Sequence, residues 1–249
     1  MGRDRGPSDR PTNFNQFQMN TCFIPARGGS KSIPKKNLFP ILNRPLIYYC
    51  LKSISLAKLV DLTVLSTDCN NTIECVGKIA QELGIKLIVD RRPDHLATDS
   101  ANVRDVIIEY VARSNCEGLN IILVQPTSPL LRSVDIDDAI RAIVVEGFDG
   151  FETISPIEHS FHAYNQRVFK ENRVSFLFKE EREKYYRKQD KPKTFKFGNV
   201  IGFRASSVIA EHTLFVNHRG AKIINPPYDF DFDTADDVEK LASILKDLP

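Results

Sequence analysis

A cluster of basic residues follows the first apolar run of the chain. The segment 21–37 reads TCFIPARGGSKSIPKKN and places Arg27, Lys31, Lys35 and Lys36 within ten residues. Paired glycines can adopt positive φ and let backbone N–H groups approach an anion. The basic side chains can donate charge-assisted hydrogen bonds to phosphate oxygens. We therefore expect a cradle for a nucleoside triphosphate, although two glycines beside basic residues also fit an ordinary turn.

Two carboxylates near the C-terminus could hold a divalent cation. Asp231 and Asp233 occur in the alternating stretch DFDT, and in a strand they would project to one face. Mg²⁺ prefers one or two carboxylates together with phosphate oxygens, so this pair is a candidate magnesium site. Asp236 and Asp237 instead fit a helix start, because Thr234 and Asp237 have capping-box spacing and acidic groups favour the N-terminal end.

The elements that must position these groups alternate along the chain. Apolar runs predict strands over 21–26, 62–67, 86–90, 120–124 and 150–154, and a further strand-like run follows at 195–203. Amphipathic segments between and after them predict helices over 45–58, 71–83, 100–113 and 134–146, with a further helix from about 234. This alternation indicates βαβ units in a three-layer α/β fold with a mostly parallel central sheet, which binds ligands at the carboxyl ends of its strands.

Composition excludes several classes of protein. The net charge is only +2, so no global field for nucleic acid is indicated, and no apolar stretch reaches the roughly 18 residues of a membrane span. The five histidines form no metal-binding motif, and the five cysteines show no C-x-x-C spacing. Neither a P-loop nor a G-x-G-x-x-G fingerprint is present. We expect a cytoplasmic protein with reduced thiols that binds neither nucleic acid nor membranes.

The leading segment and several later motifs together resemble the acylneuraminate cytidylyltransferase family. The string from 21 to 37 matches the pattern I-P-A-R-G-G-S-K-x-I-P-x-K-N, and QPTSPLLR follows at 125–132. Shorter matches occur at 66–68, 92–93, 97–99 and 231–234, so the resemblance covers about residues 21–247. It implies a Rossmann-like nucleotidyltransferase fold in one domain from 21 to 249. Residues 1–20 are polar and show no periodicity, so we expect them to form a disordered tail.

The resemblance also implies a reaction and a nucleotide site. The anomeric hydroxyl of a nonulosonic (2-keto sugar) acid would attack the α-phosphorus of CTP, giving a CMP-sugar and pyrophosphate. The implied catalytic residues are Arg27, Lys36, Gln125, Asp231 and Asp233, of which the two aspartates would hold Mg²⁺. The implied CTP-binding residues are Arg27, Gly28, Gly29, Ser30, Lys31, Lys36, Asn37, Arg92, Ala101 and Val103.

The sugar side departs from the family pattern. The family usually carries R-R-Q-D-x-P and N-G-A-I-Y, whereas this chain reads RKQDKP at 187–192 and GNVIGF at 198–203. A lysine offers a point charge where arginine pairs bidentately with a carboxylate, and a phenylalanine here lacks the tyrosine hydroxyl. The resemblance implies sugar contacts from Gln125, Arg187, Lys188, Asn199, Phe203, Leu214 and Phe215. Ordinary core packing is the alternative for Leu214 and Phe215, and Arg132 is expected to stabilise its loop.

An inserted excursion over about 157–197 is implied to pack against a second subunit, giving a homodimer or a dimer of two such dimers. Its charged run at 179–193 also fits a solvated face. Two other functions stay open from the residues alone. One is a nucleotidyltransferase that activates a sugar 1-phosphate or a shorter keto acid. The other is a non-catalytic protein that binds RNA or another anion.

Overall fold

A computed structural model describes residues 19–30 and 32–248 of the chain. Most of the predicted tail, residues 1–18, and the candidate phosphate ligand Lys31 lie outside the described residues. The first strand begins at Asn20, one position before its expected start. No helix within the described ranges is long and apolar enough to cross a membrane.

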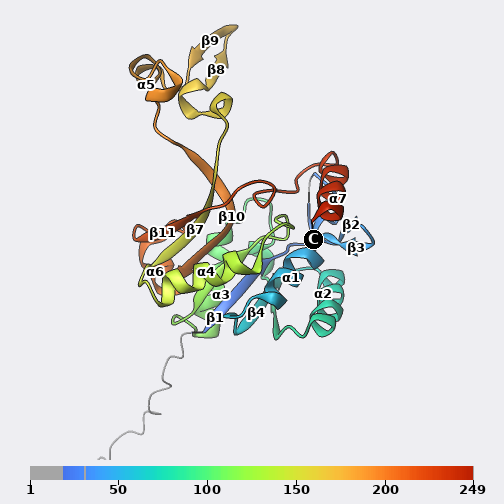
Figure 1. The fold of residues 1–249 in the computed structure, drawn as a ribbon. Coiled ribbons are helices and arrows are strands. Elements are labelled where there is room, and N and C mark those ends of the chain that lie inside the picture. Colours follow the sequence, from blue (N-terminus) through green and yellow to red (C-terminus); the bar gives the residue numbers. More distant parts are fainter. Residues whose placement is uncertain (1–18, 31, 249) are drawn as a thin grey trace, which may run out of the picture.

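A seven-stranded sheet in the order β11-β7-β10-β6-β1-β4-β5 forms the centre of the molecule (Figure 1). Strand β10 runs antiparallel to β6 and β7, and the other neighbouring pairs are parallel, so the mostly parallel sheet is confirmed. The strands are β1 (Asn20–Pro25), β4 (Leu62–Thr67), β5 (Leu87–Arg91), β6 (Asn120–Val124), β7 (Gly150–Pro156), β10 (Phe195–Arg204) and β11 (Arg219–Ile223). Two short hairpins are formed by β2 (Pro40–Ile41) with β3 (Arg44–Pro45) and by β8 (Arg167–Lys170) with β9 (Arg173–Phe176).

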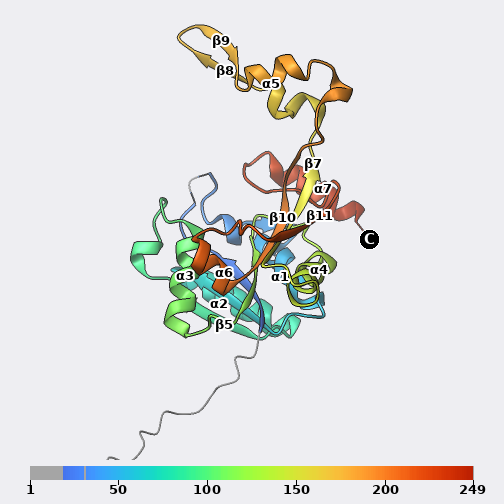
Figure 2. The ribbon, with the colours of Figure 1, turned by 90° about the vertical axis from the view of Figure 1, so that its left-hand side faces the viewer.

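Helices cover both faces of the sheet and give the expected three layers (Figure 2). The α-helices are α1 (Leu46–Leu56), α2 (Asn70–Leu83), α3 (Val103–Ser114), α4 (Ser133–Val144), α5 (Lys179–Lys184), α6 (Ala205–Glu211) and α7 (Asp237–Asp247). Alternate side chains of a strand face opposite layers. In β1, Cys22 and Ile24 therefore pack with α1, α2 and α4, whereas Phe23 packs with α3 and α6.

The C-terminal helix returns to the loop that follows β1. Phe232 is fully buried in a small core with Ile33, Leu130 and Leu241. This core joins α7 to the basic loop and to the turn after β6, so residues about 200 positions apart meet at one edge of the sheet. Helix α7 begins at Asp237 instead of near 234, and the Asp237 carboxylate accepts the backbone N–H groups of Asp233 and Thr234.

Strands β7 and β10 continue beyond the sheet as a two-stranded stalk, and residues 157–194 form an arm at its end (Figures 1 and 2). The arm contains β8, β9 and α5. The sequence pattern did not predict these elements, nor α6 and β11. The strand that was expected to end at 154 reaches Pro156, where it pairs with Phe195 at the base of the arm.

Candidate active site

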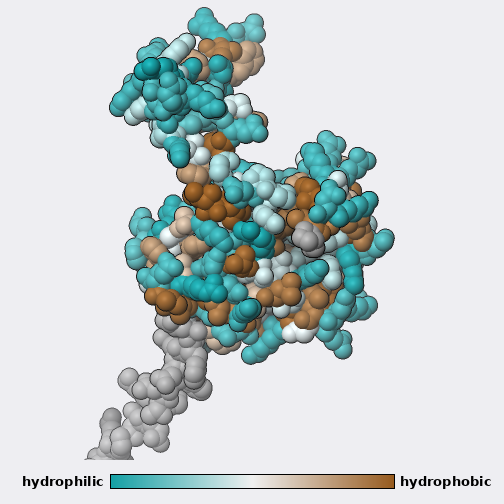
Figure 3. Space-filling view, in the orientation of Figure 1, coloured by the Kyte–Doolittle hydropathy of each residue, from teal (hydrophilic) through white to brown (hydrophobic). Residues whose placement is uncertain are grey.

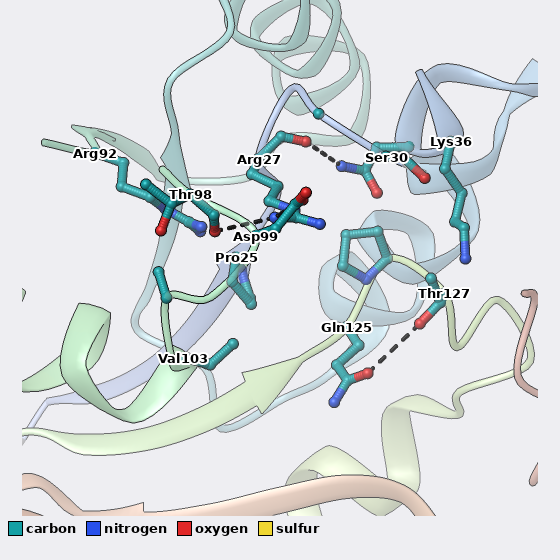
Figure 4. Close-up of a pocket in the computed structure, with 14 residues that line it drawn as sticks. Pro25, Arg27, Ser30, Lys36, Arg92, Thr98, Asp99, Val103, Gln125 and Thr127 are labelled. Atoms are coloured by element: carbon teal, nitrogen blue, oxygen red, sulfur yellow. Dashed lines mark hydrogen bonds and ion pairs between the residues drawn. The ribbon is translucent and has the colours of Figure 1, made fainter. Parts of the chain in front are cut away.

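A cavity of about 370 Å³ opens at the carboxyl ends of β1 and β6. Figure 4 shows three cationic side chains along it, with Arg92 and Lys36 at opposite ends and Arg27 between them. This is the edge at which parallel α/β sheets bind ligands. The predicted residues that line the cavity are Arg27, Gly29, Ser30, Lys36, Asn37, Arg92, Ala101, Val103 and Gln125.

Arg27 is fixed by the loop that follows β5. Its Nη1 lies 2.6 Å from Oδ1 of Asp99 and donates to the carbonyl of Thr98 at 3.0 Å. The Asn37 amide donates to the Arg27 carbonyl at 3.1 Å, which ties the two ends of the basic loop together. Thr98 and Asp99 line the cavity although no role was assigned to them. Both residues lie in the short match to the family at 97–99, which could have marked them as site residues.

Gly28 is needed for space instead of for positive φ, which corrects the expectation, whereas a Cβ added to Gly29 would meet no atom within 4 Å. Neither Gly28 nor Gly29 has a positive φ, whereas Lys35 does, at 54°. A Cβ added to Gly28 would lie 2.8 Å from the Cβ of Cys69, so a side chain cannot fit there. The Gly28 N–H donates to Asp68 at 2.7 Å, which holds the loop against the end of β4.

Arg92 is a buried, fixed donor at one end of the cavity. Its guanidinium donates to the carbonyl of Ser66 at 3.0 Å and to the Ser66 hydroxyl at 3.4 Å. Desolvation lowers the pKa of Arg92, and the positive charge of Arg27 adds to this effect, while Asp68 and Asp90 oppose it. A rigid donor in a partly dry site suits the recognition of a polar ring edge.

Lys36 joins the cavity to the acidic segment. Its Nζ lies 2.9 Å from Oδ1 of Asp233 and 3.3 Å from the carbonyl of Phe232. The Phe232 N–H in turn donates to the carbonyl of Thr127, which lines the cavity. The basic loop therefore contacts the segment that carries the predicted metal-binding carboxylates, although Asp231 and Asp233 are not among the described residues that line the cavity. Residues 230–233 have no regular secondary structure, so Asp231 and Asp233 do not lie in the strand that was expected for them.

The charge of Asp233 acts on the Asp231 carboxylate. Desolvation raises the pKa of Asp231, and the negative charge of Asp233 raises it further, against the opposing effects of Thr127 and Lys36. Two hard oxygen donors that repel each other beside a cationic cavity suit Mg²⁺, which completes its shell with water and phosphate oxygens. Within the described ranges no group of three or more His, Cys, Asp or Glu residues could hold a metal ion.

The turn after β6 presents Gln125 to the cavity. Its backbone carbonyl accepts the Ser128 N–H at 3.1 Å, and its side-chain oxygen accepts the Thr127 hydroxyl at 3.5 Å. Arg132 binds Asp135 at 2.8 Å, and its guanidinium lies 4.2 Å from the ring centre of Tyr228. This agrees with the stabilising role expected for Arg132.

The predicted sugar contacts other than Gln125 are absent from the described lining of the cavity. Phe203 is 0% exposed and packs between β6 and α6, so in this chain it is a core residue. Asn199 is 1% exposed, and its amide groups bind Thr153 and the carbonyl of Tyr228. Both side chains face the interior and neither lines the cavity, so their sugar contacts stay predictions.

The remaining predicted sugar residues lie elsewhere. Arg187 and Lys188 are on the arm, where Arg187 binds Asp190 and Lys188 lines a second cavity of about 510 Å³ at the arm's base. Leu214 packs against the core, as its alternative predicted, and Phe215 is exposed. Neither Arg187 nor Lys188 is among the described residues that line the main cavity.

The fold and the cavity together define a nucleotidyltransferase of the mostly parallel α/β class. A profile described as cytidylyltransferase matches residues 21–246, and the chain belongs to this family. Pseudaminic acid cytidylyltransferase of Campylobacter jejuni is 30% identical over 234 residues, which cover 91% of this chain and 95% of that protein. N-acylneuraminate cytidylyltransferase of Streptococcus agalactiae is 26% identical over 219 residues, which cover 87% of this chain and 51% of that protein.

Solved structures show the same fold. The structure of CMP:2-keto-3-deoxy-manno-octonic acid synthetase complexed with CTP has a TM-score of 0.66 and 17% identity, and the match covers 92% of this chain and 99% of that one. A 4-diphosphocytidyl-2C-methyl-D-erythritol synthase has a TM-score of 0.60 and 13% identity, with the same coverage. At these identities the structures support the architecture and nothing finer.

Proposed function

We propose that this chain transfers CMP from CTP to the anomeric hydroxyl of a nonulosonic acid and releases pyrophosphate. The observation that carries the proposal is the cavity at the carboxyl edge of the sheet that Arg27, Lys36 and Arg92 line, together with the ion pair that joins Lys36 to Asp233. A polyanion and a divalent cation would both find ligands there. The related proteins named for pseudaminic and N-acylneuraminic acids support the class of acceptor.

The proposed reaction needs alignment and charge neutralisation. The anomeric oxygen forms a bond to the α-phosphorus, the bond from that phosphorus to the bridging oxygen breaks, pyrophosphate leaves with the electron pair, and the hydroxyl proton passes to solvent. In this proposal Arg92 would hold the base, and Arg27 and Lys36 would bind the phosphates. Gln125, which lines the same cavity, would orient the attacking hydroxyl. Asp231 and Asp233 would hold Mg²⁺, which neutralises phosphate charge when bound.

We also propose that the arm mediates dimerisation. Large apolar side chains on it are exposed, among them Phe161, Phe169, Val174, Leu177 and Tyr186, and Figure 3 shows further hydrophobic surface where the arm leaves the body. A second subunit would cover this surface and could bring Lys188 toward a neighbouring cavity. Light scattering of the purified protein would distinguish a monomer from a dimer or a dimer of dimers. A double substitution of Phe169 and Val174 by serine is expected to weaken the assembly.

A cytoplasmic location follows as part of the proposal, since the substrate CTP is made there. The described cysteines, Cys22, Cys50, Cys69, Cys75 and Cys116, form no disulfide. Reduced thiols would be kept in that compartment.

A pyrophosphate-release assay tests the proposed function. Each of the four nucleoside triphosphates is combined with a panel of nonulosonic acids, a shorter keto acid and sugar 1-phosphates, with and without Mg²⁺. We expect release with CTP and a nonulosonic acid only when Mg²⁺ is present. Release with a sugar 1-phosphate would favour the other nucleotidyltransferase reading. Failure with CTP across the whole panel would refute the proposal and favour a binding protein.

A further inference from the structure

The segment between β11 and α7 carries Asp231 and Asp233 without the support of regular secondary structure. On its C-terminal side this segment is fixed by the buried ring of Phe232, by Lys36 and by the Asp237 carboxylate. To bind a cation, the two carboxylates must also be held in place from the N-terminal side of the segment. The contacts that do this come from the stalk of the arm.

Asp229 is held between the two strands of the stalk. Its Oδ2 accepts the Ser155 hydroxyl at 2.8 Å and lies 2.8 Å from Nζ of Lys196. Ser155 on β7 and Lys196 on β10 lie opposite each other, so one carboxylate oxygen of Asp229 contacts both strands. The Asp229 side chain is 8% exposed although the segment lies near the surface. This residue extends the aspartate alternation of 231 and 233, yet no role was assigned to it.

A bulge in β10 supplies the second contact. The register with β7 shifts between Phe197 and Ile201, and bulges re-aim side chains. At this bulge the Thr153 hydroxyl accepts hydrogen bonds from the backbone N–H groups of Asn199 and Val200, and it donates one to the side-chain oxygen of Asn199. The side-chain NH2 group of Asn199 donates to the carbonyl of Tyr228 at 2.6 Å. Asn199 therefore points at the metal-bearing segment from inside the sheet.

We propose that Asp229 is a positioning residue, through which Ser155 and Lys196 at the root of the arm set the placement of Asp231 and Asp233. Asn199 supports the same segment one residue earlier, at Tyr228. This inference rests on the proposed function, because it takes Asp231 and Asp233 as the metal ligands. Partners in the outer shell of a metal site change its affinity by about 10–100-fold when they are altered.

Metal binding without turnover tests the proposal. The probe is Mn²⁺, measured by electron paramagnetic resonance in the presence of CTP and without sugar acid. We expect Asp229→Asn to weaken Mn²⁺ binding about 10-fold, and Lys196→Met to weaken it in the same direction. The matched control is Glu152→Gln, which breaks an ion pair of 2.9 Å between Glu152 on β7 and Arg219, away from the metal-bearing segment. This control is expected to bind Mn²⁺ like the wild type.

Kinetics separates positioning from a general structural role. In Asp229→Asn the Mg²⁺ concentration for half-maximal rate should rise about 10-fold, with most of kcat recovered at saturating Mg²⁺. A lower melting temperature with an unchanged Mg²⁺ requirement would overturn the proposal. If Asp229→Asn did not fold, Lys196→Met would decide, since its side chain is 52% exposed.

Different results would refute the proposed function and the positioning role of Asp229. A wild-type protein that binds no Mn²⁺ with CTP and releases no pyrophosphate would refute the proposed function and this inference with it. A wild-type protein that does both, beside a folded Asp229→Asn variant with unchanged Mn²⁺ affinity, would refute the positioning role alone.

Discussion

The ammonium group of Lys36 lies 2.9 Å from the carboxylate of Asp233, although 197 positions separate the two residues in the chain. The contact joins the basic loop after the first strand to the acidic segment before the last helix. A cation of the protein thus already neutralises one of the two candidate metal ligands. When a triphosphate and a divalent cation bind, both groups have a stronger partner of opposite charge available.

Removal of the Lys36 charge should impair catalysis more than folding. We expect Lys36→Gln to lower kcat/KM for CTP by roughly 10²-fold, because a charge-assisted contact to the triphosphate is lost. Lys35→Gln is the matched control, since Lys35 keeps its positive φ with either side chain and is exposed. Steady-state kinetics and thermal melts would check both variants. A collapse of the melting temperature in Lys36→Gln would instead assign the residue a structural role.

Neutralisation of the aspartate pair should abolish most of the turnover. Asp231→Asn and Asp233→Asn are each expected to reduce kcat by about 10²-fold or more, because a metal ligand is lost. Asp236→Asn, on an exposed neighbour at the start of α7, should retain the wild-type rate. The measurement is pyrophosphate release over a range of Mg²⁺ concentrations. Full activity of either variant at saturating Mg²⁺ would contradict the predicted metal site.

The two loop glycines should respond differently to an added methyl group. In Gly28→Ala the new Cβ would lie 2.8 Å from that of Cys69, whereas Gly29→Ala meets nothing within 4 Å. Overpacking of this kind costs about 1–3 kcal/mol of unfolding free energy. Chemical denaturation of the ligand-free proteins would measure the difference. Equal stability of the two variants would show that the loop adjusts without cost.

A hydroxyl group at position 203 tests the buried placement of that residue. Phe203 is 0% exposed, so Phe203→Tyr is expected to lose about 1–3 kcal/mol of unfolding free energy through an unsatisfied buried hydroxyl. The KM for the sugar acid should not change. Phe215→Tyr, at an exposed ring, is the control and should be neutral. A lower sugar KM in Phe203→Tyr with unchanged stability would support the family-based expectation.

The sequence predicted β1, β4, β5, β6 and β7 because each is a short run rich in apolar residues between loops or amphipathic helices, whereas the mixed sequence RGAKI of β11 has no such pattern. The run at Asn120–Val124, for example, is buried throughout, as expected for a central strand covered on both faces. The DFD alternation was only partly informative. Phe232 is buried and its two aspartate neighbours are exposed, as in a strand, yet no neighbouring strand pairs with them.

The sugar side could not be predicted because its geometry depends on distant contacts. The bulge that turns Asn199 inward arises from the Thr153 hydroxyl, 46 residues earlier, and no local pattern of β10 reveals it. Gly198 gives a partial signal, since a Cβ there would lie 2.5 Å from Thr153 Oγ1. Lys188, by contrast, was predicted as a sugar contact, with a solvated face as the alternative for its charged run, and it is exposed on the arm.

Pro156 and Phe195 face each other across the stalk, so the chain leaves the body and re-enters it one strand spacing away. Excision of the residues between them would leave two ends that a tight turn can join, without disturbing the order of the seven strands. The arm could therefore be removed or replaced as a unit. Exchanging it between related enzymes would show how far the arm determines which sugar acid serves as the acceptor.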